Sequence, residues 1–323
     1  MYNDRIIIHK KRNRTYNALG DEMDKIKIGI PRALHYYYYG DMWRSFLEEL
    51  GYEVVISPKT TREILENGCK CANDEMCLSL KLYLGHIHYL VGKCDAILVP
   101  RIDNYGTYNQ TCTNFLGLYD IVANLFRVPL FTYNVDETHK ETEIKAFIKL
   151  GMLLGKGKEQ SKIAYFNSVQ KVEKEKKKKR KLELEKLSSS KKKLLVMSHP
   201  YNFEDALIGT EIKNTIENLG AISINANALI ESNKNDYFAF SSNLYWKYNK
   251  DLVGILPFVK DRVDGILFLS TFPCGPDSLV NELLMRKIKM PYLNLIIDEE
   301  SGSAGMETRL ESFIDILEQK KVR

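Results

Sequence analysis

The chain has 323 residues, of which 44% are hydrophobic and 28% are charged. This length and composition predict a folded protein with two domains rather than one. No apolar stretch is long enough for a membrane span, and residues 1–14 lack the apolar region of a signal peptide. We therefore expect a cytoplasmic protein without a membrane segment, whose six cysteines are reduced thiols or metal ligands rather than disulfides.

The net charge of +5 is concentrated in one segment of the chain. Residues 171–193 contain twelve Lys or Arg and four Glu, a net charge of +8, which leaves −3 for the rest of the chain. A lysine run of this kind is typical of a solvated helix or a disordered connector. No aromatic residue interrupts the run from Lys176 to Lys181, so binding of nucleic acid is not expected.

Short apolar runs alternate with helical patterns after an N-terminal arm at 1–24, which has no clear period. The strands predicted in the first half are 26–30, 52–57, 95–100 and 128–133. The helices predicted between them are 41–51, 60–68, 78–91, 115–126 and 137–154. Asp41 is the expected N-cap of the first helix, Thr60 or Thr61 that of the second, and Gly68 should close the second helix.

The second half repeats the same alternation after the lysine-rich segment. Its predicted strands are 194–198, 221–225, 264–270 and 291–297, and its predicted helices are 204–219, 244–259, 277–286 and 307–319. Strands that alternate with helices favour an α/β fold with parallel sheets. We expect two Rossmann-like lobes with parallel four-stranded sheets flanked by helices, at 25–155 and 194–323, joined by a charged linker or helix at 156–193.

Three cysteines stand where such a fold gathers its ligands. Cys112 follows the third strand of the first lobe through a polar loop, Cys274 directly follows the third strand of the second lobe, and Cys77 precedes the helix at 78–91. Ligands of open α/β sheets bind beyond the carboxyl ends of the strands, so two facing lobes would bring these cysteines to one cleft. Their wide spacing is unlike the compact pairs of zinc and small ferredoxin sites. The residues alone therefore leave two interpretations open, a shared metal site and three inert core thiols.

Four stretches of the sequence carry a family resemblance. They are KIGIPRAL (27–34), NDEMCLSLKLYLGHI (73–87), FPCGPDSL (272–279) and IDEESGSAGMETRLESFID (297–315). Together they resemble the acyl-CoA dehydratase activase-related family, which is similar to the catalytic subunits of 2-hydroxyacyl-CoA dehydratases. The resemblance runs from about residue 25 to the C-terminus and is interrupted by the lysine-rich segment.

This resemblance implies an iron–sulfur cluster held by three cysteines at the junction of α/β lobes. Carried over by motif, the ligands are Cys77, Cys112 and Cys274, and the cofactor is a 4Fe–4S cluster or a double-cubane cluster shared across a dimer. Thiolates are the soft ligands that such clusters need. Three thiolates leave one iron of a 4Fe–4S cluster open, which makes the site potentially catalytic.

The resemblance also implies a function and partners. A low-potential electron would come from a separate ATP-dependent activase, and a small molecule or acyl-CoA would be reduced or dehydrated at the open iron. The alternatives are a non-catalytic iron–sulfur accessory or electron-carrier subunit of such a system, in a homo- or heterodimer, and a metal-free α/β binding protein. The chain has no G-x-x-x-x-G-K-[ST] loop and no GxGxxG after a strand. We therefore expect it to accept the electron rather than to hydrolyse ATP.

Two further residues are candidates for a catalytic role. His199 ends a strand before Pro200 and is a candidate proton donor. Glu300 follows the last strand at a position where the family commonly has a histidine, so proton chemistry shared with the family is in doubt there. Asp277, three residues after Cys274, is expected to cap a helix or face solvent.

The remaining cysteines are expected to be peripheral. Cys69 and Cys71 form a CxC in a predicted loop, where exposed free thiols are favoured over auxiliary ligands. Cys94 precedes a buried strand and is expected to be a core residue.

Overall fold

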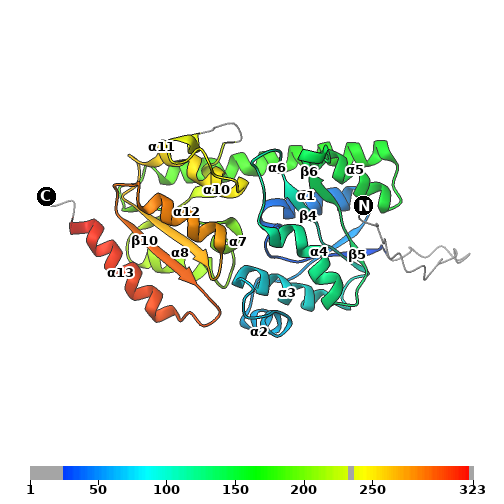
Figure 1. The fold of residues 1–323 in the computed structure, drawn as a ribbon, viewed down its shortest axis with the longest axis horizontal. Helices are drawn as coiled ribbons and strands as arrows, with labels where there is room; N and C mark the ends of the chain where they lie inside the picture. The colour runs from blue at the N-terminus through cyan, green and yellow to red at the C-terminus, as the bar shows by residue number, and fades with distance from the viewer. Residues whose placement is uncertain (1–24, 232–235, 320–323) are drawn as a thin grey trace, which may run out of the picture.

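The computed structural model describes residues 25–231 and 236–319, so the predicted arm at 1–24 lies outside the described residues. Two four-stranded sheets form the cores of two lobes, which lie side by side in Figure 1. The first sheet has the order β2-β1-β3-β5 and the second the order β10-β9-β7-β8, and all neighbouring strands are parallel. The strands are β1 (Lys27–Ile30), β2 (Glu53–Ile56), β3 (Ala96–Leu98), β5 (Leu130–Phe131), β7 (Lys193–Met197), β8 (Ile222–Asn225), β9 (Gly265–Thr271) and β10 (Tyr292–Ile297). The predicted α/β class with two parallel sheets is confirmed.

The first lobe contains every predicted helix, with changes at the ends. Its helices are α1 (Tyr36–Glu49), α2 (Arg62–Cys71), α3 (Leu78–Leu90), α4 (Thr113–Leu125) and α5 (Glu143–Leu153), and a small parallel pair of strands is formed by β4 (Arg101–Asn104) and β6 (Asn134–Asp136). The expected cap of α1 at Asp41 is wrong, because the helix already begins at Tyr36. The predicted helix 137–154 is also wrong at its start. A short 3₁₀ turn, η1 (Glu137–His139), ends at Lys140, whose φ of 63° cannot continue a helix.

Gly68 does not close α2, contrary to the prediction. Thr61 caps the helix by accepting a hydrogen bond from the Ile64 amide, and the helix continues through Gly68 to Cys71. A Cβ at Gly68 would lie 1.9 Å from the carbonyl oxygen of Lys81 on α3, and a Cβ at Gly85 would lie 2.0 Å from that of Ile64. The two glycines are therefore required by the close approach of α2 and α3.

Two helices of the second lobe differ from the prediction. The helices of this lobe are α7 (Pro200–Phe203), α8 (Gly209–Asn218), α9 (Ala226–Leu229), η2 (Asp236–Ala239), α10 (Lys247–Gly254), α11 (Leu256–Val259), α12 (Gly275–Met285) and α13 (Ser303–Gln319). The predicted helix 204–219 begins only at Gly209, because the Asp205 carboxylate accepts bonds from the amides of Leu207 and Ile208, at 2.8 and 3.1 Å, and holds the preceding residues in a turn. The predicted helix 244–259 is divided near Pro257, whose ring nitrogen has no hydrogen to donate.

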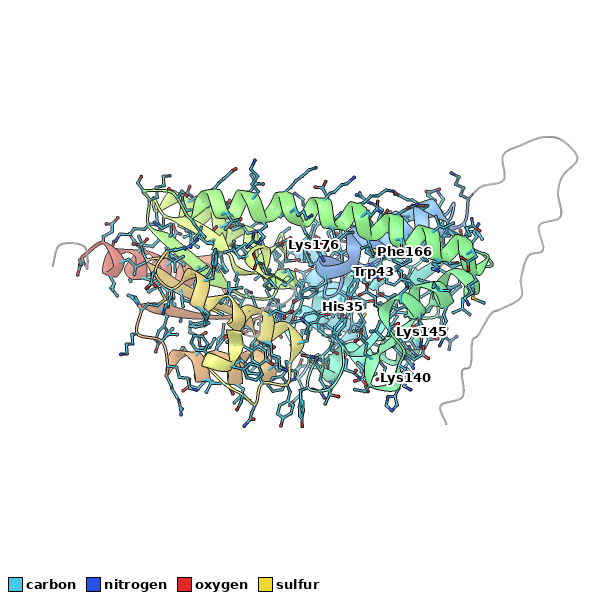
Figure 2. The ribbon with its side chains drawn as sticks, turned by 90° about the horizontal axis from the view of Figure 1, so that it is seen from above. His35, Trp43, Lys140, Lys145, Phe166 and Lys176 are labelled. Carbon is cyan, nitrogen blue, oxygen red and sulfur yellow. The ribbon has the colours of Figure 1, made fainter. Side chains whose placement is uncertain are left out.

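The lysine-rich segment is a continuous helix, α6 (Lys158–Lys186), of 29 residues. It contacts α1 and α5 of the first lobe and α9 and β8 of the second. Figure 2 shows it running along both lobes, with Lys176 nearer the second lobe than Phe166. Its buried Glu183 accepts a hydrogen bond from the Asn225 amide at 2.8 Å, and its outer face carries pairs such as Lys178–Glu175 at 2.7 Å. Of the two interpretations of the lysine run, the solvated helix is therefore correct, and the helix bridges the lobes.

Among the helices of residues 25–231 and 236–319, none contains an apolar stretch of the length that a membrane span requires.

An ion pair between Lys81 and Glu299 joins α3 of the first lobe to the loop after β10 of the second. The Lys81 side chain is 3% exposed and that of Glu299 is 32% exposed. The hydrogen bond from Lys81 holds the pKa of Glu299 below its ordinary value of 4.5. Because the folded pKa is depressed, this contact stabilises the fold fully above about pH 4.5, and the stabilisation is lost as the pH falls through the folded pKa.

We expect Glu299→Gln to lower the free energy of unfolding by about 2 kcal/mol at pH 7, since it leaves a buried ammonium without its counter-charge. The deficit should shrink as the pH falls below about 4, where Glu299 of the unmodified chain is also protonated. Urea titrations at both pH values measure the difference. Glu300→Gln is the matched control, because Glu300 is exposed and next in the chain. Equal free energies of unfolding for the two variants at pH 7 would show that the Lys81–Glu299 ion pair does not stabilise the fold.

Candidate functional site

The three predicted ligand cysteines occupy equivalent positions at the starts of three helices. Cys77 is the N-cap of α3, Cys112 of α4 and Cys274 of α12, each with an extended backbone. At this position the free amide groups of the first helical turn lie near the side chain, and the helix dipole favours negative charge. Pro276 lies in the first turn of α12, where its missing amide costs nothing.

The structure brings these cysteines together. Although they come from both lobes, they line one pocket, which contains about 510 Å³ of space including the part that opens to solvent. The other lining residues are about half apolar or aromatic and half polar, namely Leu34, Ser79, Leu80, Gln110, Thr111, Asn114, Phe115, His199, Tyr201, Trp246, Tyr248, Asn249, Thr271 and Pro276. The pocket therefore lies between the lobes, where the alternating strands and helices predicted a site.

Backbone hydrogen bonds between the lobes fix the cysteine-bearing loops. The amide of Leu78, next to Cys77, donates to the carbonyl of Phe272 at 3.0 Å. The Gln110 amide donates to the Tyr245 carbonyl at 3.0 Å, and the Gln110 carbonyl accepts from the Lys247 amide at 2.9 Å. The relative placement of the three sulfurs thus depends on the docking of the lobes.

Burial dominates the acidity of these thiols. It raises the pKa of Cys77 and of Cys112, while first-turn amides, such as that of Leu80 for Cys77, act in the opposite direction. The pKa of Cys274 is raised most, first by burial and then by the neighbouring Asp277 carboxylate. In the metal-free protein the three thiols are therefore protonated at neutral pH, and binding of a metal must release their protons.

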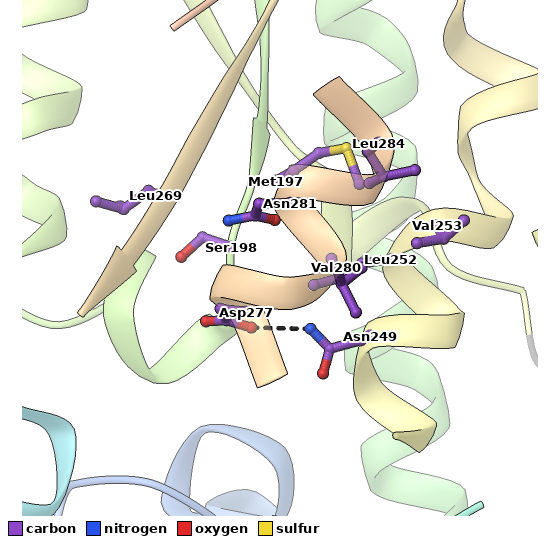
Figure 3. A pocket seen from close by; sticks show the side chains of 10 residues that line it. All are labelled: Met197, Ser198, Asn249, Leu252, Val253, Leu269, Asp277, Val280, Asn281 and Leu284. Carbon is purple, nitrogen blue, oxygen red and sulfur yellow. Dashed lines mark hydrogen bonds between the residues drawn. The ribbon is translucent and has the colours of Figure 1, made fainter. Parts of the chain in front are cut away.

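The buried carboxylate of Asp277 lies close to Cys274, which it follows by three residues. Asp277 Oδ1 is 2.9 Å from His199 Nε2 and accepts a hydrogen bond from Asn249 at 2.8 Å, as Figure 3 shows for Asn249. The second ring nitrogen of His199 bonds to the Tyr38 hydroxyl at 3.0 Å. Burial alone would raise the pKa of Asp277, but His199 and the donors Asn249 and Cys274 hold it below its ordinary value.

The expectation that Asp277 caps a helix or faces solvent is therefore wrong. Its side chain points inward because His199 and Asn249 offer donors there, and its Oδ2 is buried without a hydrogen-bond partner. His199 stands in the pocket, as its position at a strand end suggested.

Sequence reasoning did not assign any tyrosine to the site, but Tyr248 lines the pocket and Tyr38, from the run 36–39, bonds to the lining His199. Tyr38 stacks on Tyr248 with ring centroids 4.1 Å apart. The Tyr248 hydroxyl bonds to that of Tyr105 at 2.9 Å, which bonds in turn to Tyr39 at 2.6 Å. The density of tyrosines at 36–39 was the only signal, and it did not distinguish a site from packing between the lobes.

The other candidates lie elsewhere. Glu300 is exposed and is not among the residues that line the pocket, whereas its neighbour Glu299 turns inward to Lys81. Cys69 and Cys71 lie in the last turn of α2 and are half-buried, so their prediction as exposed loop thiols is wrong. Cys94 packs against the apolar core of the first lobe and donates a weak hydrogen bond to the Leu90 carbonyl at 3.4 Å.

Three thiols are the groups in this pocket that could hold a metal or a cluster. Among the side chains of residues 25–231 and 236–319, no three His, Cys, Asp or Glu are grouped closely enough to hold a single metal ion. An iron–sulfur cluster spreads its ligands further apart, because each thiolate binds a different iron. Three thiols at helix starts in one pocket are the kind of soft ligands that such a cluster needs. The buried carboxylate of Asp277 opposes its negative charge.

Comparison with protein families assigns most of this chain. Residues 27–229 match the model of the CoA enzyme activase uncharacterised domain (DUF2229). The chain belongs to this family. The assignment confirms the predicted resemblance to activase-related proteins, and the matched range includes Cys77 and Cys112 but ends before Cys274.

Other comparisons add little. No curated protein matches the sequence. Similar solved structures include a Ni²⁺ complex of the binding protein FpvC from Pseudomonas aeruginosa, at 14% identity over 92% of this chain and 98% of that one. They also include ZnuA, at 10% identity over 91% and 99%, and a mutant Mn-bound periplasmic metal-binding protein from Candidatus Liberibacter asiaticus, at 12% over 91% and 99%. All three have a TM-score of 0.26, which carries no argument about this chain.

Proposed function

We propose that this protein binds an iron–sulfur cluster through Cys77, Cys112 and Cys274 and uses it in electron transfer for CoA-linked chemistry of the 2-hydroxyacyl-CoA dehydratase type. The observation that supports this most is the common pocket, into which three helix starts from two lobes bring a cysteine each. Cysteines that only pack in a hydrophobic core would not be expected to stand at three helix N-caps around one pocket. The family assignment supports the link to CoA-enzyme activation.

The residues of the chain have distinct tasks in this proposal. The bound cluster would supply one-electron chemistry, with an iron that no protein thiolate occupies. First-turn amides such as that of Leu80 favour thiolates once their protons are lost, and the rings of Tyr201, Trp246 and Tyr248 exclude water. His199 lines the pocket and is held in place there by Asp277 on one ring nitrogen and Tyr38 on the other, and its imidazole is the candidate proton donor of the site.

Anaerobic purification tests the cofactor directly. We expect a brown protein with roughly four irons and four sulfides per chain, or more for a shared double cubane, and an electron paramagnetic resonance signal after reduction with dithionite. Colourless protein that takes up neither iron nor sulfide during anaerobic reconstitution would reject the proposal. A thiol titration before and after reconstitution supplies a second readout, since three thiols should become protected.

Turnover distinguishes a catalyst from an electron carrier. With an ATP-dependent activase and reductant, we expect the loaded protein to dehydrate a 2-hydroxyacyl-CoA or reduce another small substrate. We further expect His199→Gln to lower kcat by about 100-fold, the scale of a lost general acid, while iron content stays unchanged. Reduction without turnover on any substrate tested would assign the chain to the accessory electron carriers instead.

A further inference from the structure

A row of hydrogen-bonded side chains leads away from the cysteine pocket. It begins at Tyr248 of α10, which lines the pocket. The Tyr248 hydroxyl lies 2.9 Å from that of Tyr105, which lies 2.6 Å from that of Tyr39 on α1. The Tyr39 hydroxyl in turn donates to Oε2 of Glu143 on α5 at 2.8 Å. We call these four residues the tyrosine relay, which passes from the second lobe into the first.

The hydrogen bonds of the tyrosine relay have one direction. A phenol carries a single hydrogen, and an ionised carboxylate only accepts. Tyr39 gives its hydrogen to Glu143, so the bond between Tyr39 and Tyr105 is donated by Tyr105. For the same reason the bond between Tyr105 and Tyr248 is donated by Tyr248. All three hydrogens therefore point from the pocket toward Glu143, which is the order in which a row of hydroxyls passes a proton outward.

The groups of the relay are suited to carrying protons. Burial is the largest of the causes that raise the pKa of Tyr39, Tyr105 and Tyr248, so their hydroxyls stay neutral at pH 7 and can both accept and donate. Glu143 is only partly buried, in the first turn of α5, and its other oxygen accepts a hydrogen bond from Tyr165 of α6 at 3.0 Å. Its carboxylate can therefore take a proton from the relay and exchange it with water.

The proposed chemistry needs a path for protons. An electron added to a pocket that already holds the buried Asp277 carboxylate increases the negative charge in a poorly solvated space, which favours the uptake of a proton. A substrate that fills the opening of the pocket also keeps water out. A proton must then enter or leave through the protein, and the tyrosine relay connects the wall of the pocket with a partly exposed carboxylate.

We propose that the tyrosine relay carries protons between the cysteine pocket and solvent at Glu143. This inference rests on the proposed function, because reduction of the group held by the three cysteines is what draws the proton in. At each transfer one O–H bond breaks and one forms on the next oxygen, so a proton lost from Glu143 at one end appears in the pocket at the other. No electron moves along the relay. The three donors reverse when a proton passes inward and return when one passes outward.

The test follows the electron and the proton separately in the reconstituted full-length protein. Reduced methyl viologen supplies electrons without protons, and its loss of colour reports the reduction. A pH indicator in weakly buffered solution reports the proton. Tyr105→Phe removes the middle hydroxyl of the relay, and Glu143→Gln keeps an oxygen that accepts from Tyr39 but cannot pass a proton to water. The matched control is Tyr165→Phe, which removes the hydroxyl from the other oxygen of Glu143.

We expect the unmodified chain and Tyr165→Phe to take up a proton as fast as they are reduced. In Tyr105→Phe and Glu143→Gln, proton uptake should be at least about tenfold slower than in the control, with unchanged iron content, because each has lost a group that transfers the proton. A purely structural role of the hydrogen bonds would not slow proton uptake by Glu143→Gln, which keeps the bond to Tyr39.

Equal rates of proton uptake in all four proteins would overturn the relay while leaving the cluster in place, and so would reduction of the unmodified chain without proton uptake. Glu143→Gln decides the question if Tyr105→Phe fails to take up iron. Failure of the unmodified chain to take up iron is a separate outcome, which rejects the proposed function itself.

Discussion

We expect each of the single substitutions Cys77→Ser, Cys112→Ser and Cys274→Ser to remove more than about half of the iron and sulfide from anaerobically reconstituted protein. The physical reason is that a neutral hydroxyl replaces a soft thiolate at one of three anchoring positions, and cluster affinity depends on every thiolate. All three positions are equivalent N-caps in one pocket, so the three single variants should behave alike. Iron and sulfide analysis with electron paramagnetic resonance measures the loss.

Cys94→Ser is the control for this series. Cys94 is also a half-buried free thiol, but it packs against the first-lobe core and does not line the pocket. It should retain the iron content of the unmodified chain. Full loading of the three pocket variants, together with loss of iron from Cys94→Ser, would place the metal elsewhere and contradict the proposed ligand set.

The second large effect concerns the packing that positions Cys77. We expect Gly68→Ala and Gly85→Ala each to lower the free energy of unfolding by about 3 kcal/mol or more. An added Cβ would lie 1.9 Å from the Lys81 carbonyl oxygen in the first case and 2.0 Å from that of Ile64 in the second. These are backbone atoms, so only a separation of α2 from α3 relieves the overlap. Urea denaturation measures the loss.

Gly117→Ala separates this overlap from the ordinary effect of the substitution. Gly117 lies inside α4, and nothing lies within 4 Å of its added Cβ. This variant should gain about 0.5–1 kcal/mol, because alanine loses less backbone entropy than glycine in a helix. If Gly117→Ala were as destabilised as Gly68→Ala, the glycine-to-alanine change itself, and not the close approach of α2 and α3, would account for the loss of stability.

The spacing of apolar residues was enough to predict the bounds of elements whose apolar face begins and ends with the element itself. α3 was predicted to within one residue, because Leu80, Leu84 and Ile87 define one apolar face from its start. The start of α8 was predicted too early. The sequence does not show whether the carboxylate of Asp205 accepts hydrogen bonds from two backbone amides in a turn or lies inside a helix. The role of Gly68 was predicted wrongly for a similar reason. From sequence alone, a glycine that ends a helix cannot be distinguished from a glycine that lets a second helix pack closely.

Side-chain periodicity is a property of neighbouring residues, and it was enough to predict the alternation of strands and helices, and hence two parallel sheets. The sequence also singled out Cys77, Cys112 and Cys274, although spacing alone left them open as core thiols. Three features came from the folded structure and not from local pattern: the three cysteines share a pocket, Asp277 turns inward to His199, and Glu299 rather than Glu300 pairs with a buried lysine. Those outcomes depend on how two lobes dock, and docking is set by contacts between residues far apart in the chain.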